Sequence, residues 1–207
     1  MTWGRSGGFD SSGRDPFGPD IPIGETKYEM IDLVGPHLRV SGQIALLAFG
    51  RLSDRINQSR GYVRLKDAQL LRRNGDPTNL IVPELMVNPD EITFVGQRGE
   101  AMAATPAGSP GARDRPVMER TRRQVVIFTA GHTLIGTIHT FAETDITTFV
   151  DSPDPRFVAM TDVTARSLAD RRVISHFALT LVNRTQMTAV SFLENAGRAA
   201  ETGVAVE

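Results

Sequence analysis

The sequence contains no cysteine, which excludes disulfide bonds, thiolate metal sites and a cysteine nucleophile. Aromatic residues make up only 6% of the 207 residues, so the stacking platforms of single-strand binders are not expected. No apolar run approaches the roughly 18 residues of a membrane span. The first 20 residues, rich in Gly, Ser, Asp and Pro, also lack the apolar core of a signal peptide. These absences favour a cytoplasmic protein with no membrane span.

Motifs for catalysis and for bound cofactors are also missing. The sequence has no Ser-x-x-Lys motif, no GxxxxGK phosphate loop and no GxGxxG dinucleotide fingerprint. The histidines form neither a His-x-His nor a His-Glu-x-x-His arrangement: His37, His132, His139 and His176. We therefore predict no catalytic residue, no cofactor and no metal site, and we favour a protein that is not an enzyme.

An internal repeat organises the chain. Residues 38–44 align with 132–138 at an offset of 94, and after one inserted residue 62–68 align with 157–163 at an offset of 95. Apolar character is retained in order over about 55 residues, which indicates duplication of one unit. The predicted organisation is a tail at 1–24, β repeat 1 at 25–96, a flexible linker at 97–116, β repeat 2 at 117–192, and a C-terminal tail at 193–207.

Each repeat reads as five short antiparallel strands and one short helical turn. In the first repeat, residues 28–34 form a β-rich run that a Gly-Pro turn ends, and the helical turn spans 51–57. Leu52 and Ile56 lie four residues apart there, so both can face a core. The sequence thus predicts a mainly β protein with two tandem copies of a small five-stranded antiparallel bent sheet or barrel.

The motif Arg51-Leu52-Ser53-Asp54-x-Ile56-Asn57, followed by Tyr62-Val63-x-Leu65-x-Asp67-Ala68, carries a family resemblance. It is similar to a family of uncharacterised bacterial tandem β domains with the signature R-L-S-D-x-I/L-N … Y/F-V-x-L-x-D-A. More distantly, each repeat resembles the Sm-like small β-barrels, through its Gly-x-Ile strand and its Asn turn between the last two strands. The Arg-Gly pair of the second Sm motif is replaced by Asn88-Pro89 and Asn183-Arg184. The resemblance implies an Sm/SH3-like barrel and, as one alternative, an RNA-binding function.

Two groups of residues are candidates for contact with RNA or another ligand. The first is Asp54 and Asn57, although capping of the helical turn is the interpretation we favour for both. The second is an arginine cluster near the end of the linker: Arg113, Arg115, Arg120, Arg122 and Arg123. These arginines could contact phosphates or an acidic partner, but a solvated linker end is the more common reading of such a run.

A third group recurs in both repeats, which favours a role in the shared fold: Gly42, Asp67, Asn88, Gly136, Asp162 and Asn183. Asp67 and Asp162 could instead form a carboxylate pair beside a pocket between the repeats, as in a small-ligand sensor or hydrolase. We favour a non-enzymatic protein-interaction or scaffold module whose sheet edges pair with a protein partner or with copies of the chain. Sm-like RNA binding is the alternative, and the pocket is a weaker one.

Overall fold

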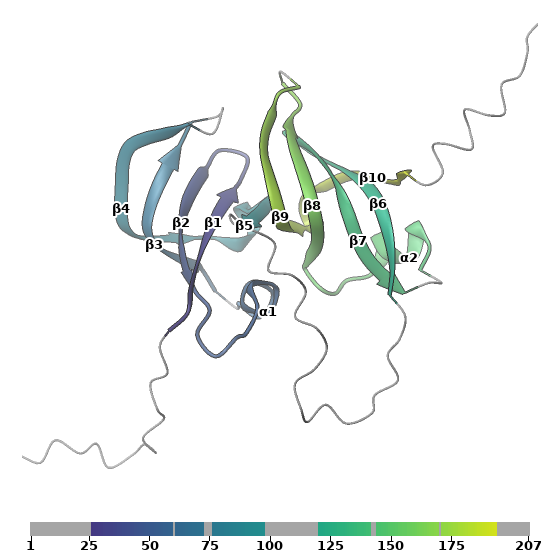
Figure 1. Cartoon of the computed structure of the whole chain (residues 1–207), viewed down its shortest axis with the longest axis horizontal. Coiled ribbons are helices and arrows are strands. Elements are labelled where there is room, and N and C mark those ends of the chain that lie inside the picture. Colours follow the sequence, from purple (N-terminus) through teal and green to yellow (C-terminus); the bar gives the residue numbers. More distant parts are fainter. Residues whose placement is uncertain are drawn as a thin grey trace, which may run out of the picture.

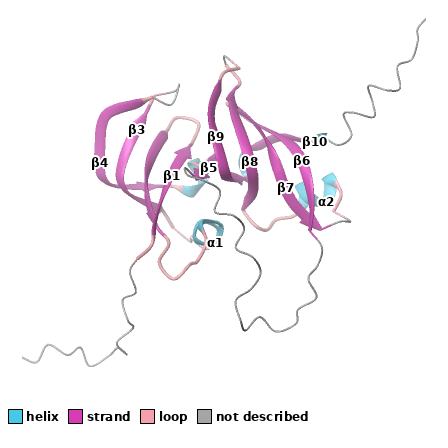
Figure 2. Ribbon diagram, viewed as in Figure 1, coloured by secondary structure: helices cyan, strands magenta, loops and turns pink. Residues whose placement is uncertain are grey.

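The computed structural model describes residues 26–59, 61–72, 76–97, 120–141, 144–169 and 171–193. In these residues the protein is mainly β, with ten strands in one antiparallel sheet and two short α-helices (Figure 1, Figure 2). The strand order is β10-β6-β7-β8-β9-β5-β1-β2-β3-β4. This order has two ends, β10 and β4, so strand pairing within the described residues does not close a barrel.

We call residues 26–97 the first half and residues 120–193 the second half. The first half contains β1 (Tyr28–Val34), β2 (Arg39–Ala45), α1 (Leu52–Asn57), β3 (Val63–Leu71), β4 (Pro77–Val87), the 3-10 helix η1 (Pro89–Glu91) and β5 (Phe94–Gln97). The second half contains β6 (Arg120–Thr129), β7 (His132–Phe141), α2 (Ile146–Asp151), β8 (Phe157–Ser167), β9 (Val173–Asn183), the 3-10 helix η2 (Arg184–Gln186) and β10 (Met187–Phe192). The predicted tail at 1–24 and nearly all of the predicted linker and C-terminal tail lie outside the described residues.

The pairing registers of the two halves correspond at most positions. Ile31 pairs with Gly42 in the first half, and Val125 pairs with Gly136 in the second, both 94 positions later. The pairs of β1 with β5 recur between β6 and β10, with β10 lying 95 positions after β5. Two residues at these offsets, 94 up to the α-helix and 95 from β3 onward, are called corresponding residues below.

A β-bulge bends the sheet at the same place in each half. The registers shift between Ser41 and Gln43 on β2 and at the corresponding residues of β7. Asp67 and Asp162 supply the extra residue, with left-handed φ angles of 48° and 54°. Aspartate tolerates this conformation better than most non-glycine residues, because its side chain can bond the local backbone.

A glycine lies opposite each bulge. A Cβ atom on Gly42 would lie 3.1 Å from the carbonyl oxygen of Lys66, and one on Gly136 would lie 2.9 Å from that of Thr161. Both glycines therefore allow the bulged strand to approach closely.

Two hydrophobic clusters fill the fold, and each takes side chains from both halves. The first-half cluster contains Phe157 and Leu181 from the second half, and the second-half cluster contains Val34 and Phe94 from the first. The halves therefore share their cores rather than only a surface. Among the described residues, no helix is long and apolar enough to cross a membrane.

Candidate interaction site: the β5–β9 joint and the free sheet edges

The two halves meet edge to edge, where β5 pairs antiparallel with β9. The register is Phe94 with Val182, Val95 with Leu181, Gly96 with Thr180, and Gln97 with Leu179. The backbone N–H of Asn183 extends this ladder by donating to the carbonyl of Thr93 at 3.0 Å. We call this contact the joint. It converts two edges that would otherwise be free into the middle of one sheet.

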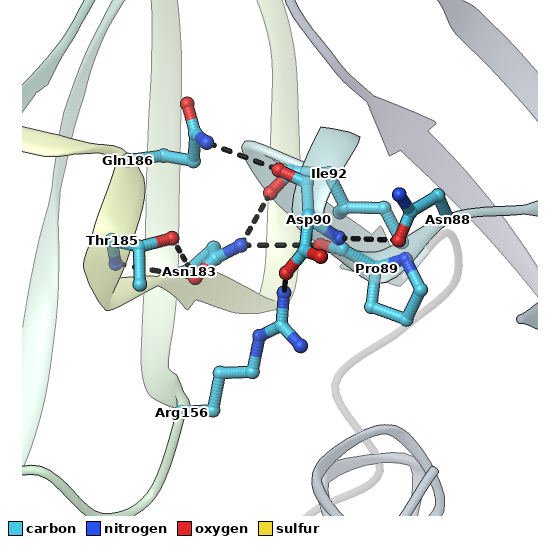
Figure 3. A network of polar contacts seen from close by, with 8 residues as sticks. All are labelled: Asn88, Pro89, Asp90, Ile92, Arg156, Asn183, Thr185 and Gln186. Atoms are coloured by element: carbon cyan, nitrogen blue, oxygen red, sulfur yellow. Dashed lines mark hydrogen bonds and ion pairs between the residues drawn. The ribbon is translucent and has the colours of Figure 1, made fainter. Parts of the chain in front are cut away.

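Asn183 holds the joint together with one fully buried side chain (Figure 3). Its amide nitrogen donates to the carbonyl oxygens of Pro89, at 3.2 Å, and Ile92, at 2.9 Å. Its amide oxygen accepts from the backbone N–H and the hydroxyl of Thr185, at 3.2 and 2.9 Å. The side chain thus caps η2 with its oxygen and fastens the first half with its nitrogen.

The corresponding residue, Asn88, caps a 3-10 helix but makes no hydrogen bond across the joint among the described residues. Among the described residues its side chain makes one hydrogen bond, accepting from the N–H of Asp90 at 3.1 Å. It caps η1 as Asn183 caps η2, but its amide nitrogen reaches no second unit. The two asparagines therefore share a local role, and only Asn183 has a long-range one.

Further polar contacts cross the joint nearby. Arg156 forms an ion pair with Asp90, and the side chain of Gln186 donates to the Asp90 carbonyl at 3.1 Å (Figure 3). Asn57 makes two hydrogen bonds to the backbone of Phe157, donating at 3.0 Å and accepting at 2.7 Å. The exposed ion pair contributes little to stability, whereas the bonds of Asn57 fix the start of β8 against α1.

Steric fit at the joint depends on a glycine. A Cβ atom on Gly96 would lie 2.5 Å from the ring of Phe177, which is 3% exposed. The absent side chain leaves room for the phenyl ring of Phe177 on β9 next to the backbone of β5. Phe177 in turn contacts the ring of Phe94, with centroids 6.1 Å apart.

Buried charge lies near the joint, on β1, which pairs with β5, and on β2. Asp32 of β1 and Arg39 of β2 form a buried ion pair, 3.8 Å between carboxylate oxygen and guanidinium nitrogen, and Arg39 donates to the carbonyl of Ile174 at 3.4 Å. His132 packs edge-on against Phe94, with centroids 5.4 Å apart. Burial, and secondly the positive charge of Arg39, lowers the pKa of His132 below its usual value of 6.5.

This depressed pKa makes stability depend on pH. Unfolding returns His132 to its ordinary pKa, so the unfolded chain binds the proton at higher pH than the folded one. The contribution is therefore fully present above about pH 6.5 and is lost as the pH falls towards the lower folded pKa. We expect urea denaturation to show a larger loss of stability between pH 7.5 and 5 for the natural chain than for a His132→Asn variant. Equal slopes in the natural chain and the His132→Asn variant would contradict the assignment.

The sheet ends in two free edges of different composition. Among the described strands, β4 pairs only with β3, and β10 pairs only with β6. The β4 edge carries Pro77, Pro83 and Glu84, and prolines and charged residues limit the pairing of an edge with another strand. The β10 edge, Met187–Phe192, has neither a charged residue nor a proline. An edge of that composition is open to another strand.

The structure places the predicted contact residues apart from one another. Asp54 is exposed within α1 and forms no cap, since α1 has no side-chain cap, and Asn57 bonds to the other half. The favoured capping interpretation is therefore wrong for both residues. In α2, by contrast, Asp145 does cap, accepting from the N–H of Thr148 at 2.7 Å. That hydrogen bond is the main cause of the lowered pKa of Asp145.

The arginine cluster does not form one patch within the described residues. Arg113 and Arg115 lie outside them, and only the backbone of Arg120 is described. Arg122 is exposed, while its neighbour Arg123 donates to the carbonyl of Thr144 at 2.8 Å and lies over the ring of Phe192. Adjacent residues of a strand point to opposite faces, so Arg122 and Arg123 cannot both contact one phosphate group.

A cleft of about 850 Å³ lies beside α1 and strands β7 to β9. Its lining includes Glu29, Arg51, Thr161 and Arg184. Asp67 and Asp162 do not line it, so the two carboxylates do not meet at this cleft. Burial lowers the pKa of Arg184, whose guanidinium donates to the carbonyls of Pro155 and Phe149. Within the described ranges, no three His, Asp or Glu side chains are grouped to hold a metal ion.

Sequence reasoning located the Asn turns but missed the contacts that cross the joint. Arg156 and Gln186 carry no local signal, because their partner Asp90 lies 66 and 96 positions away in the sequence. The same holds for Arg39, whose carbonyl partner Ile174 lies 135 positions away. A scan against protein-family models finds no match, and searches of curated proteins and of solved structures find none either.

Proposed function

We propose that this protein is a non-enzymatic assembly module, built by tandem duplication of one five-stranded β unit and acting through its free sheet edges. One observation carries the proposal. The two halves already associate edge to edge at the joint, while the edges that correspond to β5 and β9 pair with no further strand in the described part of the chain. A fold that uses such edges once internally has the means to use them again with a partner.

The duplication is supported by features that recur at corresponding positions. The strand registers, the bulges at Asp67 and Asp162, and the 3-10 helices capped by Asn88 and Asn183 all recur at an offset of 94 or 95. We assign the units to residues 25–96 and 117–192, each a strongly bent sheet resembling a small Sm/SH3-like barrel. We retain the cytoplasmic location expected from the sequence.

The non-enzymatic role is supported by the structural roles of the candidate residues. Asp67 and Asp162 supply bulges, Asn57 and Asn183 hold the halves together, and Arg123 bonds a backbone carbonyl. The bulges are backbone features of Asp67 and Asp162, and the side chains of Asn57, Asn183 and Arg123 make structural hydrogen bonds.

Light scattering of the purified full-length chain, with absorbance read at 260 and 280 nm on the same peak, tests the function. We expect a mass of at least twice 22.6 kDa and no excess absorbance at 260 nm. A strict monomer at every concentration, together with no captured partner, would remove the proposal. Nucleic acid that co-purifies and dissociates with salt would favour the Sm-like RNA-binding alternative instead.

A further inference from the structure

The joint supplies a template for contacts between chains. Its strands β5 and β9 correspond to β10 and β4, at an offset of 95, and those two strands are the free ends of the sheet. We propose that chains assemble head to tail, with β10 of one chain pairing with β4 of the next in the register of the joint. The proposal rests on the assembly function above and names its partner as a second copy of this chain. We call the new contact the head-to-tail joint.

The template fixes the register. Corresponding positions give four antiparallel pairs: Ala189 with Val87, Val190 with Met86, Ser191 with Leu85, and Phe192 with Glu84. Pro83 falls one residue beyond the last pair, so its missing N–H removes no hydrogen bond from the ladder. The proline limits the length of the pairing without preventing it.

Exposure of apolar side chains points to the same contact. At the joint, three side chains contributed by both halves are buried: Ile56 (2%), Phe157 (1%) and Leu181 (0%). The three corresponding side chains lie beside the free edges and are exposed: Val150 (49%), Tyr62 (59%) and Met86 (51%). In the head-to-tail joint Tyr62 and Met86 of one chain would cover the second-half cluster of its neighbour, beside Val150. The three positions that the head-to-tail joint would bury thus carry apolar side chains, although these side chains are exposed in the single chain.

Side-chain volume is also compensated. At the joint, Gly96 leaves room for the ring of Phe177. The corresponding pair is Ser191 and Val82, in which the smaller valine leaves room for the serine side chain. A larger residue on β10 is therefore matched by a smaller one on β4, which keeps the two strands able to approach.

The hydrogen bonds that Asn183 makes across the joint have a counterpart at the free edges. Asn183 donates across the joint to the carbonyls of Pro89 and Ile92. Asn88 stands at the corresponding place, and its targets would be the carbonyls of Arg184 and Met187 on the neighbouring chain. Because β10 and β4 are different surfaces, the contact is heterologous, and repeated copies close into a ring or extend as a filament.

Cysteine crosslinking tests the register, because the natural chain has no cysteine to interfere. Two full-length variants, Met86→Cys and Val190→Cys, are mixed and oxidised under mild conditions. We expect a disulfide-linked dimer in the mixture, of twice 22.6 kDa, and at least about tenfold less in either variant alone. As the matched control, Glu84→Cys mixed with Val190→Cys moves one thiol two residues along the same edge and should crosslink at least about tenfold less.

The outcomes separate the inference from the proposed function. Efficient crosslinking of Met86→Cys alone would mean a symmetric contact of two β4 edges, which overturns the head-to-tail joint but keeps an assembly module. Equal crosslinking of the control mixture would overturn the register. A monomeric mass with no crosslink in any mixture would overturn the inference. The assembly function would be overturned as well only if no other protein were captured by the chain.

A charge placed in the predicted contact gives an independent test. Met86→Glu should weaken self-association at least about tenfold in light scattering across a dilution series, because the carboxylate would be buried without a partner. Ile81→Glu is the matched control, since Ile81 is an exposed apolar residue of the same strand outside the four pairs. It should leave association unchanged, and circular dichroism should show both variants folded. Equal weakening by the two variants would overturn the assigned register.

Discussion

The Asn183→Asp substitution is expected to lower the free energy of unfolding by at least about 3 kcal/mol. The two side chains have nearly the same shape, so packing is preserved. The change replaces the amide nitrogen that donates to the carbonyls of Pro89 and Ile92 with an oxygen that cannot donate. It also places a carboxylate in a fully buried position against two carbonyl oxygens. Urea denaturation followed by circular dichroism measures the loss.

The corresponding substitution, Asn88→Asp, is the matched control and should change stability by no more than about 0.5 kcal/mol. The side chain of Asn88 only accepts a hydrogen bond, from Asp90, and aspartate caps a helix as well as asparagine does. Both variants should be measured at a dilution where chains do not associate. If the two substitutions cost the same, Asn183 acts only as a cap, and its bonds across the joint do not stabilise the fold.

This contrast shows which parts of the fold the sequence could predict. Turn chemistry predicted that both asparagines lie between the last two strands, and both cap a 3-10 helix there. Local periodicity likewise predicted a strand at 28–34, which is β1, and a helical turn at 51–57, which contains α1. These features depend on residues a few positions apart, so a single sequence carries them.

The joint could not be predicted, because its signals are not local. The bonds of Asn183 reach residues 94 and 91 positions earlier, and those of Asn57 reach a residue 100 positions later. Period-two alternation shows which face of a strand is buried, but it does not show which edge pairs with which. For the same reason the sequence predicts that the linker begins at residue 97, although Gln97 belongs to β5, a strand in the middle of the sheet.

The Gly96→Ser substitution is expected to lower the free energy of unfolding by about 3 kcal/mol, because its Cβ would lie 2.5 Å from the buried ring of Phe177. Phe177→Val alone should cost about 2 kcal/mol, through lost apolar contacts and a cavity. The double variant, Gly96→Ser with Phe177→Val, reproduces the Ser191 and Val82 pair of the free edges. We expect it to lose at least about 1 kcal/mol less than the sum of the two single variants, because the valine removes the clash.

Urea denaturation of the natural chain, the two single variants and the double variant completes this double-mutant cycle. Ser191→Gly is the control, because Ser191 lies exposed on a free edge. This substitution should change the free energy of unfolding by less than about 1 kcal/mol. Additive losses would mean that the cost of Gly96→Ser does not come from the ring of Phe177. A favourable coupling would mean that the smaller Val82 and the larger Ser191 satisfy the same steric requirement as Phe177 and Gly96. The free edges would then retain the geometry of the joint, although none of the described strands covers them.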